Sequence, residues 1–535
     1  MASINNSSPP TAVVAGGGPA GALAAKVLSE RGFYVHLYEA YPHPGRDGND
    51  NKGDHASDSK PENNSRAYVI SVNPRGQLAL NRCGINPLID LDAGVVNKAV
   101  IRHSNGKSRV KKIEDGQGSV MLPRRDLAAS LLRAAEKSGA EVHCGWRLID
   151  VNFEKKEVML VKVKEGRTDE DEDNAATKEK TVRYDLLVGA DGVRSQTRNR
   201  LSNYLNEIGI DFCVKTAEDN MEYQVATLPR PWKEIILAEK VNAPPLDTVS
   251  PASLHSFADT KTGSTGLCFP VRSKSSLSSI SNNIDDESPI DKFLVCVIFP
   301  GGELGKMKRS GYPLGYESAL SGLFANWTPE SLSELARLLA EEDNVPNTGG
   351  VCIWSQALSH PESGVILVGD AGHGMWPSLG QGCNAALESV SVLADAIEAV
   401  DGSVSSGAGC RNIDFSTSSN KELVEAIALE YDGLRREDAL AAVDLTFGGI
   451  GGTKKRAVVH SPVVFKFQIW IFMILHKVTG GLVPMPVMLR IMKGDCGRYS
   501  TLKWEMKVEK YVVYGIFIGI LGFGLRGFGY VNNKE

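Results

Sequence analysis

Apolar and polar residues change their spacing several times within the first forty positions of the chain. Residues 11–15 (TAVVA) form an apolar run typical of a buried parallel strand, and residues 33–39 (FYVHLYE) predict a second strand. Between them, residues 22–30 are alanine-rich with helical spacing, and a glycine-rich segment precedes them. This order of strand, turn, helix and strand predicts a right-handed β-α-β unit of the kind that binds dinucleotides.

The same patterns recur further along and predict an α/β fold. A helical spacing at 127–138 and strand patterns at 141–148, 184–189 and 364–369 extend a doubly wound sheet. Between these strands the pattern changes to short strand-like stretches, at 266–271 and 293–300, and one helix at 329–342, which favours a second domain built on a sheet. We therefore expect a Rossmann-like domain over 1–210 and 347–450, an inserted sheet domain over 211–346, and a tail over 451–535.

Three segments interrupt these patterns with almost wholly polar sequence. They cover residues 45–65, 165–181 and 273–288, and are rich in Gly, Asn, Asp, Glu or Ser. Such compositions cannot bury enough apolar surface to order themselves, so we expect disordered surface insertions that carry none of the chemistry.

Composition and charge narrow the class of protein. With 535 residues, 42% apolar and 23% charged, the chain is globular, and disordered or fibrous classes are excluded. Nine cysteines without a C-x-x-C pair or a Cys/His cluster predict neither a disulfide scaffold nor a metal site, and indicate a reducing, cytosol-facing location. The first ten residues do not have the pattern of a secretory or transit peptide.

The tail differs from the body in charge. Residues 451–535 carry 13 Lys and Arg against 4 Asp and Glu, a surplus of +9 that leaves −14 for the rest of the chain. A basic, apolar tail indicates a membrane surface and no nucleic acid. Residues 511–525 are apolar but short for a hydrocarbon core of about 30 Å, and residues 463–475 have an interfacial pattern. The alternatives are a membrane span, a surface attachment, or core helices of a soluble cap.

The candidate chemistry begins in the glycine-rich turn. In Gly16-x-Gly18-x-x-Gly21, the first glycine permits a sharp turn and the second lets the backbone approach a pyrophosphate. The third lets helix pack on strand, and the helix N-terminus faces the phosphates. Glu39, at the end of the second predicted strand, can accept a hydrogen bond from a ribose hydroxyl.

Two later segments indicate which dinucleotide is bound. Asp191 follows the strand at 184–189 and Asp370 follows the strand at 364–369, where a carboxylate can hold a ribose or ribityl hydroxyl. Glycines after Pro377 open a further helix, whose free N–H groups suit the electron-rich edge of a flavin.

Together these segments resemble the single-component FAD-dependent aromatic hydroxylases, most of all the branch that hydroxylates kynurenine. The resemblance includes residues 66–71 (RAYVIS), 74–80 (PRGQLAL), 124–127 (RRDL) and 434–445, and reaches the basic tail. It implies that NAD(P)H reduces FAD, and that the reduced flavin activates oxygen to hydroxylate an aromatic ring. It also implies attachment to the mitochondrial outer membrane by the tail.

The resemblance assigns roles residue by residue. Around the cofactor it implies Gly16, Gly18, Ala20 and Gly21 at the pyrophosphate, Glu39 with its neighbour Ala40 at the adenosine ribose, Arg66 and Arg124 at phosphate or ribityl oxygens, Leu148 by the adenine, Asp191 and Asp370 along the cofactor, and Asn384 with its neighbour Cys383 at the isoalloxazine ring. His373 belongs to the third motif, and we interpret it as a turn histidine bonded to backbone.

The substrate side departs from the family pattern. The arginine that binds the substrate carboxylate in the kynurenine branch aligns with Ala99, and an expected tyrosine aligns with Lys112. The nearest cations along that strand are Lys98 and Arg102, which we take as candidate substrate residues. The expected function is therefore FAD-dependent hydroxylation of an aromatic substrate by oxygen, with kynurenine first. Another aromatic, polycyclic or isoprenoid substrate, or a flavin-binding membrane protein without hydroxylase activity, remains open.

Overall fold

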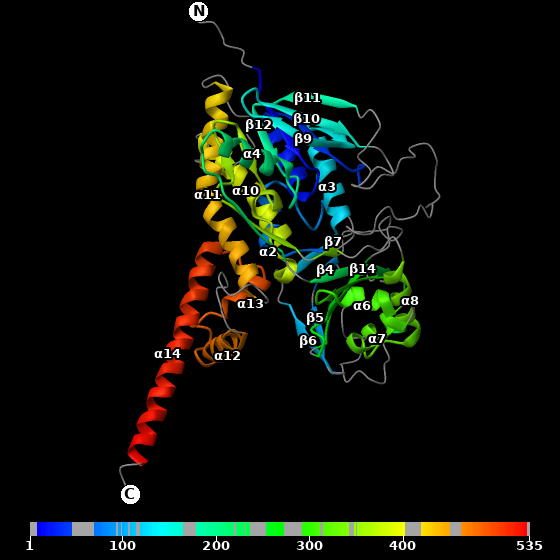
Figure 1. The fold of residues 1–535 in the computed structure, drawn as a ribbon, viewed down its shortest axis with the longest axis vertical. Coiled ribbons are helices and arrows are strands. Elements are labelled where there is room, and N and C mark those ends of the chain that lie inside the picture. Colours follow the sequence, from blue (N-terminus) through cyan, green and yellow to red (C-terminus); the bar gives the residue numbers. More distant parts are fainter. Residues whose placement is uncertain are drawn as a thin grey trace, which may run out of the picture.

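The structure is a computed structural model of the chain. It describes residues 8–44, 69–91, 95–97, 99–104, 107–113, 118–163, 178–218, 221–229, 232–235, 253–259, 261–271, 292–310, 314–341, 347–348, 350–401, 419–449 and 462–531. The polar segments 45–65 and 273–288 lie outside the described residues, as does most of 165–181. Figure 1 shows an upper body, a smaller sheet domain below it and to the right, and a tail that ends in one long helix.

A six-stranded sheet forms the centre of the upper body. Its order is β20-β21-β12-β1-β2-β8, and every neighbouring pair except β20–β21 is parallel. The strands are β1 (Thr11–Ala15), β2 (Tyr34–Glu39), β8 (Glu141–Cys144), β12 (Leu186–Gly189), β20 (Ser359–His360) and β21 (Val365–Leu367). Parallel strands are buried on both faces, which explains their continuous apolar runs. The Rossmann-like sheet expected from the sequence is thus present.

Helices cover one face of this sheet and a small antiparallel sheet covers the other. The helices are α1 (Pro19–Glu30), α2 (Pro74–Arg82), α3 (Arg124–Lys137), α10 (Gly382–Val400) and α11 (Asn420–Gly449), whose apolar residues form one core cluster. The opposite face packs against β9 (Trp146–Asn152), β10 (Glu157–Lys162), β11 (Glu179–Arg183) and α4 (Gln196–Glu207). A three-stranded sheet of β3 (Val69–Val72), β7 (Ser119–Pro123) and β4 (Val95–Asn97) lies toward the second domain.

The second domain is built on a seven-stranded sheet with its own core. Its order is β18 (Asn347–Thr348), β14 (Glu222–Leu228), β17 (Lys292–Phe299), β16 (Thr265–Val271), β15 (Leu254–Ala258), β5 (Ala99–Ser104) and β6 (Lys107–Lys112). The core is closed by α6 (Glu303–Ser310), α7 (Leu314–Leu323) and α8 (Pro329–Ala340), with the short α5 (Trp232–Ile235) nearby. A two-stranded pair, β13 (Val214–Glu218) and β19 (Val351–Ser355), leads back to the upper body.

This sheet draws on a segment that the sequence pattern had suggested for the first domain. Strands β5 and β6 come from residues 99–112, and β5 joins the sheet by pairing in parallel with β15. Only this long-range pairing assigns the segment, because nothing local distinguishes its strands from those of the Rossmann-like sheet. In the β5–β6 pair Ala99 lies directly opposite Lys112, and Arg102 lies opposite Arg109.

The tail consists of α12 (Pro462–Val478), α13 (Val487–Met492) and α14 (Tyr499–Val531). Part of the tail docks on the body: α13 and the start of α14 share a core cluster with α11 and with Trp354 and Trp376. Its second part leaves the body, as α14 extends away in Figure 1. Across the part of the chain that the structure describes, none of the helices combines the length and the apolar character needed to cross a membrane.

Candidate functional site: a dinucleotide cradle

The glycine turn lies between β1 and α1 and is tightly packed. Gly16 has φ +104°, and a Cβ atom there would lie 2.4 Å from the Ala190 carbonyl oxygen. A Cβ on Gly21 would lie 1.9 Å from the Gly16 carbonyl oxygen. Gly18 differs, because among the residues that the structure describes the one atom near its hypothetical Cβ is Nη2 of Arg124, at 3.3 Å. The turn is therefore closed on the protein side and open at Gly18.

Helix α1 presents a free N-terminus at this opening. Gly18 occupies the N-cap position with φ −66°, and none of the side chains that the structure describes caps the helix. The first N–H groups of a helix have no partner within the helix, and together with the helix dipole they attract anions. Ala20, in the first turn, is partly exposed beside Gly369, the last residue before α9 (Asp370–His373). This geometry fits a pyrophosphate group.

Glu39 lies directly beside the turn. Its carboxylate accepts hydrogen bonds from the backbone N–H of Gly17, at 2.5 Å, and of Tyr41, at 3.0 Å. Glu39 and the adjoining Ala40 are both partly exposed. The carboxylate is therefore held in place at the end of β2, where a ribose hydroxyl can reach it.

Arg124 and Asp370 lie at the same opening. Arg124 starts α3 and its guanidinium approaches Gly18. Desolvation by the surrounding protein raises the pKa of the Asp370 carboxyl, and the Arg124 charge opposes that effect. Asp370 is nevertheless exposed to solvent. A carboxylate that is closely surrounded by protein but still reached by solvent is placed to contact a small polar molecule.

Cys383 completes this group without being a reactive thiol. Desolvation raises its pKa to about 12, with smaller effects from Arg124 and Asp370. The thiol therefore stays protonated at neutral pH and offers a weak donor and a small apolar surface. It lies at the start of α10, whose N-cap residue Gln381 makes no side-chain cap, so this helix also presents free N–H groups.

The side chains of two residues expected to touch the cofactor are hydrogen-bonded to other groups of the protein. The Asp191 carboxylate accepts hydrogen bonds from the Ser195 hydroxyl (2.5 Å) and from the backbone N–H (3.0 Å) and hydroxyl (3.1 Å) of Thr197, so it anchors the start of α4. The fully buried Asn384 side chain accepts from Asn73 N–H at 3.0 Å and donates to the carbonyls of Ser71 (3.0 Å) and Gly380 (2.9 Å).

The partners of Asp191 lie only four and six residues away along the chain, whereas Ser71 and Asn73 reach Asn384 only in the folded chain. We expect Asp191 to support the cradle by ordering its own loop. Asn384 ties α10 to the segment that joins β3 and α2, and we expect its backbone, not its side chain, to face a flavin ring.

His373 is a structural histidine, but its partner differs from the one expected. Its Nε2 lies 2.7 Å from the Ser389 hydroxyl, which Arg435 also contacts at 2.9 Å. Desolvation and the Arg435 charge lower the pKa of His373 to about 3. The ring is fully buried and neutral, and its partner is a side chain of α10 instead of backbone.

The remaining expected residues are placed as follows. Leu148 is buried on β9 in the core cluster behind β2 that also contains Tyr38. Arg66 and Lys98 lie outside the described residues, and Arg102 is described only through its backbone on β5. The structure thus brings the glycine turn, Glu39, Arg124, Asp370 and Cys383 to one region, and these residues together form the dinucleotide cradle.

The tail reaches this region through contacts that no sequence motif marks. Tyr499, at the start of α14, donates to Gln381 Oε1 at 2.9 Å, and Gln381 donates to the Ile491 carbonyl at 3.2 Å. Arg75 lies over the Tyr499 ring at 3.8 Å and pairs with Glu388 at 2.5 Å. Arg75 and Gln381 lie in segments that resemble the family, so the sequence marked these two residues but did not show which residues they contact.

The chain matches two families of known domains. Residues 14–58 match the NAD(P)-binding Rossmann-like domain, and residues 57–234 match the FAD binding domain. The cradle fits FAD, because it offers two uncapped helix N-termini, an acceptor beside the glycine turn and the solvent-reached Asp370.

Similar proteins extend the match along most of the chain. Kynurenine 3-monooxygenase of Neurospora crassa is 27% identical over 466 residues, covering 84% of this chain and 79% of the relative. Kynurenine 3-monooxygenase of Stenotrophomonas maltophilia is 25% identical, covering 71% of this chain and 70% of the relative. Among solved structures, 2-methyl-3-hydroxypyridine-5-carboxylic acid oxygenase superposes with a TM-score of 0.54 at 17% identity, covering 91% and 96% of the two chains.

The fold, the cradle and these matches define an FAD-dependent monooxygenase of the aromatic hydroxylase class, with NAD(P)H as the electron donor. Within that class the chain is kynurenine 3-monooxygenase-like.

Proposed function

We propose that the protein hydroxylates L-kynurenine to 3-hydroxykynurenine with NADPH as reductant. The observation that carries this proposal is the similarity to kynurenine 3-monooxygenases of both fungi and bacteria over most of each chain. The motifs of the dinucleotide cradle lie within the segments that resemble the family.

The residues of the cradle would bind and orient the cofactor. The α1 N-terminus at Gly18 would hold the pyrophosphate, Glu39 the adenosine ribose, and Arg124 with Asp370 polar groups further along. When bound, FAD supplies the oxygen activation that no side chain can provide. The protein must then exclude water around the reacting ring, since a leaking site would waste the activated oxygen.

The substrate carboxylate needs a cation, and the strand register supports Lys112 as the first candidate. Positions 99 and 112 are directly opposite in the antiparallel β5–β6 pair, and opposite positions share a face of the sheet. Position 102 is three residues from 99 and therefore belongs to the other face of β5. The lysine at position 112 would thus supply, from the neighbouring strand, the positive charge that is missing at position 99. Lys98 and Arg102 remain the alternatives.

Substrate-stimulated oxidation of NADPH tests the activity. We expect L-kynurenine to accelerate NADPH consumption by the FAD-loaded protein and to yield a product with one added oxygen atom, identified by mass spectrometry. A panel of phenols, aromatic acids and isoprenoids serves as the comparison. Stimulation by one of these and not by kynurenine would transfer the assignment to that substrate, and no stimulation by any would indicate a flavoprotein without hydroxylase activity.

Single substitutions test the cation. Loss of a charged hydrogen-bond partner costs about 1.5 to 3 kcal/mol, so Lys112→Ala should raise the KM for kynurenine by roughly tenfold or more at unchanged flavin content. Arg102→Ala is the matched control on the other face of the strand. A larger effect of Arg102→Ala than of Lys112→Ala would reverse this assignment.

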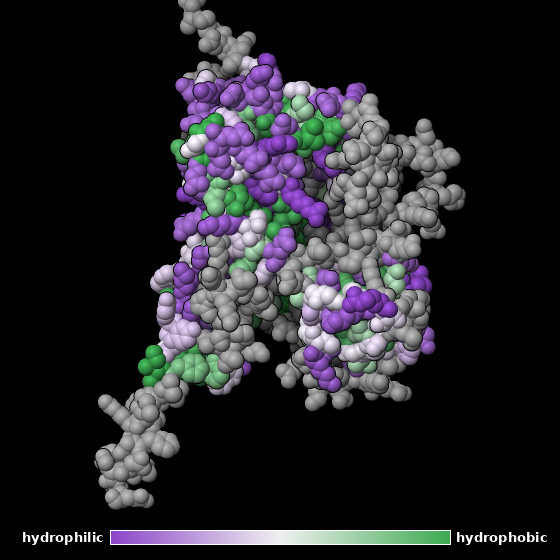
Figure 2. Space-filling model, in the orientation of Figure 1, coloured by the Kyte–Doolittle hydropathy of each residue, from purple (hydrophilic) through white to green (hydrophobic). Residues whose placement is uncertain are grey.

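We further propose that the tail attaches the enzyme to a membrane surface. On α12 the side chains of Phe467, Trp470, Ile474 and Val478 are 41%, 61%, 40% and 78% exposed, and their spacing of three or four residues forms one apolar stripe. Figure 2 shows hydrophobic side chains gathered at the lower end of the described part of the tail. An exposed apolar stripe on a basic segment suits interfacial binding to lipid.

A substitution within the apolar stripe of α12 tests membrane attachment and leaves the contacts between the tail and the cradle intact. We expect Trp470→Glu to reduce co-sedimentation with vesicles that contain anionic lipid, because burying a carboxylate among lipid chains is costly. Leu429→Glu is the control, since Leu429 is 68% exposed on α11 in the body. Equal sedimentation of both variants and the wild type would contradict attachment through α12.

A further inference from the structure

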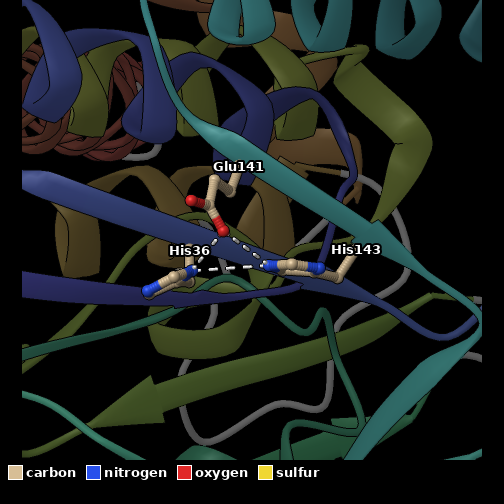
Figure 3. A group of neighbouring side chains, drawn as sticks. All are labelled: His36, Glu141 and His143. Carbon is tan, nitrogen blue, oxygen red and sulfur yellow. Dashed lines mark hydrogen bonds and ion pairs between the residues drawn. The ribbon is translucent and has the colours of Figure 1, made fainter.

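Three potential metal ligands meet at the edge of the six-stranded sheet. His36 lies on β2, while Glu141 and His143 lie on the edge strand β8. The parallel register pairs His36 with Glu141 and Tyr38 with His143, which puts all three ligands on one face. Figure 3 shows the three side chains pointing toward one another.

The distances between the ligand atoms fit a tetrahedral metal site. His36 Nδ1 lies 3.2 Å from Glu141 Oε2 and 3.4 Å from His143 Nε2, and His143 Nε2 lies 3.5 Å from Glu141 Oε2. Zinc binds nitrogen and oxygen ligands at about 2.0 to 2.2 Å, which places neighbouring ligand atoms of a tetrahedron roughly 3.3 Å apart. The three atoms therefore match one face of a tetrahedron, with a fourth position left for solvent.

Neighbouring groups hold these ligands in place. The Tyr34 hydroxyl donates to Glu141 Oε1 at 2.5 Å, so Oε2 is the oxygen that faces both imidazoles. The His143 ring stacks on Tyr38 at 4.8 Å between centroids, with 16° between the planes. Such outer contacts orient the ligands of protein metal sites.

The local electrostatics favour a neutral imidazole pair. Desolvation lowers the pKa of both His36 and His143, so both rings keep a free lone pair at neutral pH. Lys180 is the nearby cation, and its Nζ donates to the Tyr38 hydroxyl at 3.0 Å. Its positive charge weakens the binding of a metal ion, whereas the Glu141 carboxylate strengthens it.

We propose that His36, Glu141 and His143 bind a divalent transition-metal ion of the Zn²⁺ class, which joins the edge strand β8 to β2. Two imidazoles and one carboxylate suit Zn²⁺ and related ions, whereas Mg²⁺ and Ca²⁺ prefer oxygen ligands alone. The site is separate from the hydroxylation chemistry, although β2 continues from His36 to Glu39 in the cradle. Metal binding should therefore stabilise the FAD-binding sheet.

Calorimetric titration of the FAD-loaded full chain with Zn²⁺ tests the proposal. Bound metal is first stripped with a chelator, which is then removed by dialysis. We expect one equivalent of Zn²⁺ per chain above any background, and no binding of Mg²⁺. His143→Ala should weaken Zn²⁺ binding at least tenfold. His360→Ala is the matched control, because His360 is also partly buried on the same sheet, on β20, and it should bind Zn²⁺ as the wild type does.

A second variant separates a lost ligand from a lost fold. Glu141 is 46% exposed, so Glu141→Gln keeps the shape of the side chain and should not impair folding, while it removes the charged ligand. Zn²⁺ should raise the thermal midpoint of the wild type but not that of Glu141→Gln, at equal flavin content. Zn²⁺ binding that persists unchanged in both His143→Ala and Glu141→Gln would place the ion elsewhere in the protein. No binding by the wild type would leave only a hydrogen-bonded pair of histidines at this position. Either result would overturn the metal site.

Discussion

Two glycines of the first turn should fail in different ways when each becomes alanine. A Cβ at position 21 would lie 1.9 Å from the Gly16 carbonyl oxygen, on the order of 1.5 Å closer than ordinary contact. The obstacle is backbone, so no change of rotamer relieves it. Overpacking costs about 1 to 3 kcal/mol, and we expect Gly21→Ala to lose at least about 3 kcal/mol of unfolding free energy.

Position 18 has the opposite character. Within the described part of the chain its Cβ would meet only the end of the flexible Arg124 side chain, at 3.3 Å, and its φ of −66° suits any residue. We therefore expect Gly18→Ala to change the unfolding free energy by less than about 0.5 kcal/mol. The added methyl group would nevertheless occupy the place where backbone meets the pyrophosphate. FAD affinity should then fall at least tenfold, equivalent to about 1.4 kcal/mol, and Gly18→Val should abolish FAD retention.

Urea unfolding of the apoprotein and fluorescence titration with FAD separate the two effects. Gly433→Ala is the control, because Gly433 lies in the interior of α11 and no atom of the described residues lies within 4 Å of the added Cβ. This substitution should stabilise the protein by about 0.5 to 1 kcal/mol and leave FAD binding unchanged. The reasoning would be refuted if Gly21→Ala unfolded like the wild type, or if Gly18→Ala bound FAD with wild-type affinity.

Two further predictions concern the motif that begins at Asp370. Asp370→Ala should lose FAD on gel filtration, because it removes the carboxylate that protein surrounds and solvent still reaches; full flavin absorbance in the variant would contradict this role. His373 has a folded pKa of about 3 against about 6.5 when unfolded, so its contribution to stability is complete above pH 6.5 and declines as the pH falls toward 3. Between pH 7.5 and 5 the wild type should lose about 2 kcal/mol more than His373→Asn in urea unfolding, and parallel pH profiles would exclude this assignment.

Features of the protein that depend on neighbouring residues along the chain could be predicted from the sequence. The unit of β1, glycine turn, α1 and β2 could be predicted because each element has its own periodicity, and because the glycines and Glu39 lie within one such unit. The FAD cofactor and the hydroxylase class were likewise predicted, from three motifs in a particular order.

Tertiary structure decided which side chains are free and which are engaged. Asp370 is reached by solvent although protein surrounds it closely, whereas the hydrogen bonds of Asp191 to Ser195 and Thr197 are local. Asn384 stands in the predicted flavin motif, but its side chain is taken up by the backbone of Ser71 and Asn73. A hydrogen bond to a group some 310 residues away depends on how helices pack on the sheet, which local sequence patterns do not record.

Long-range register decided the rest. The pairing of β5 with β15 moved residues 99–104 into the second sheet, and the pairing of β5 with β6 set Ala99 opposite Lys112. The pairing of β2 with β8 brought His36 beside residues more than a hundred positions away. A shift of register by one residue turns every side chain of a strand to the other face, so such clusters exist only once the strands have paired.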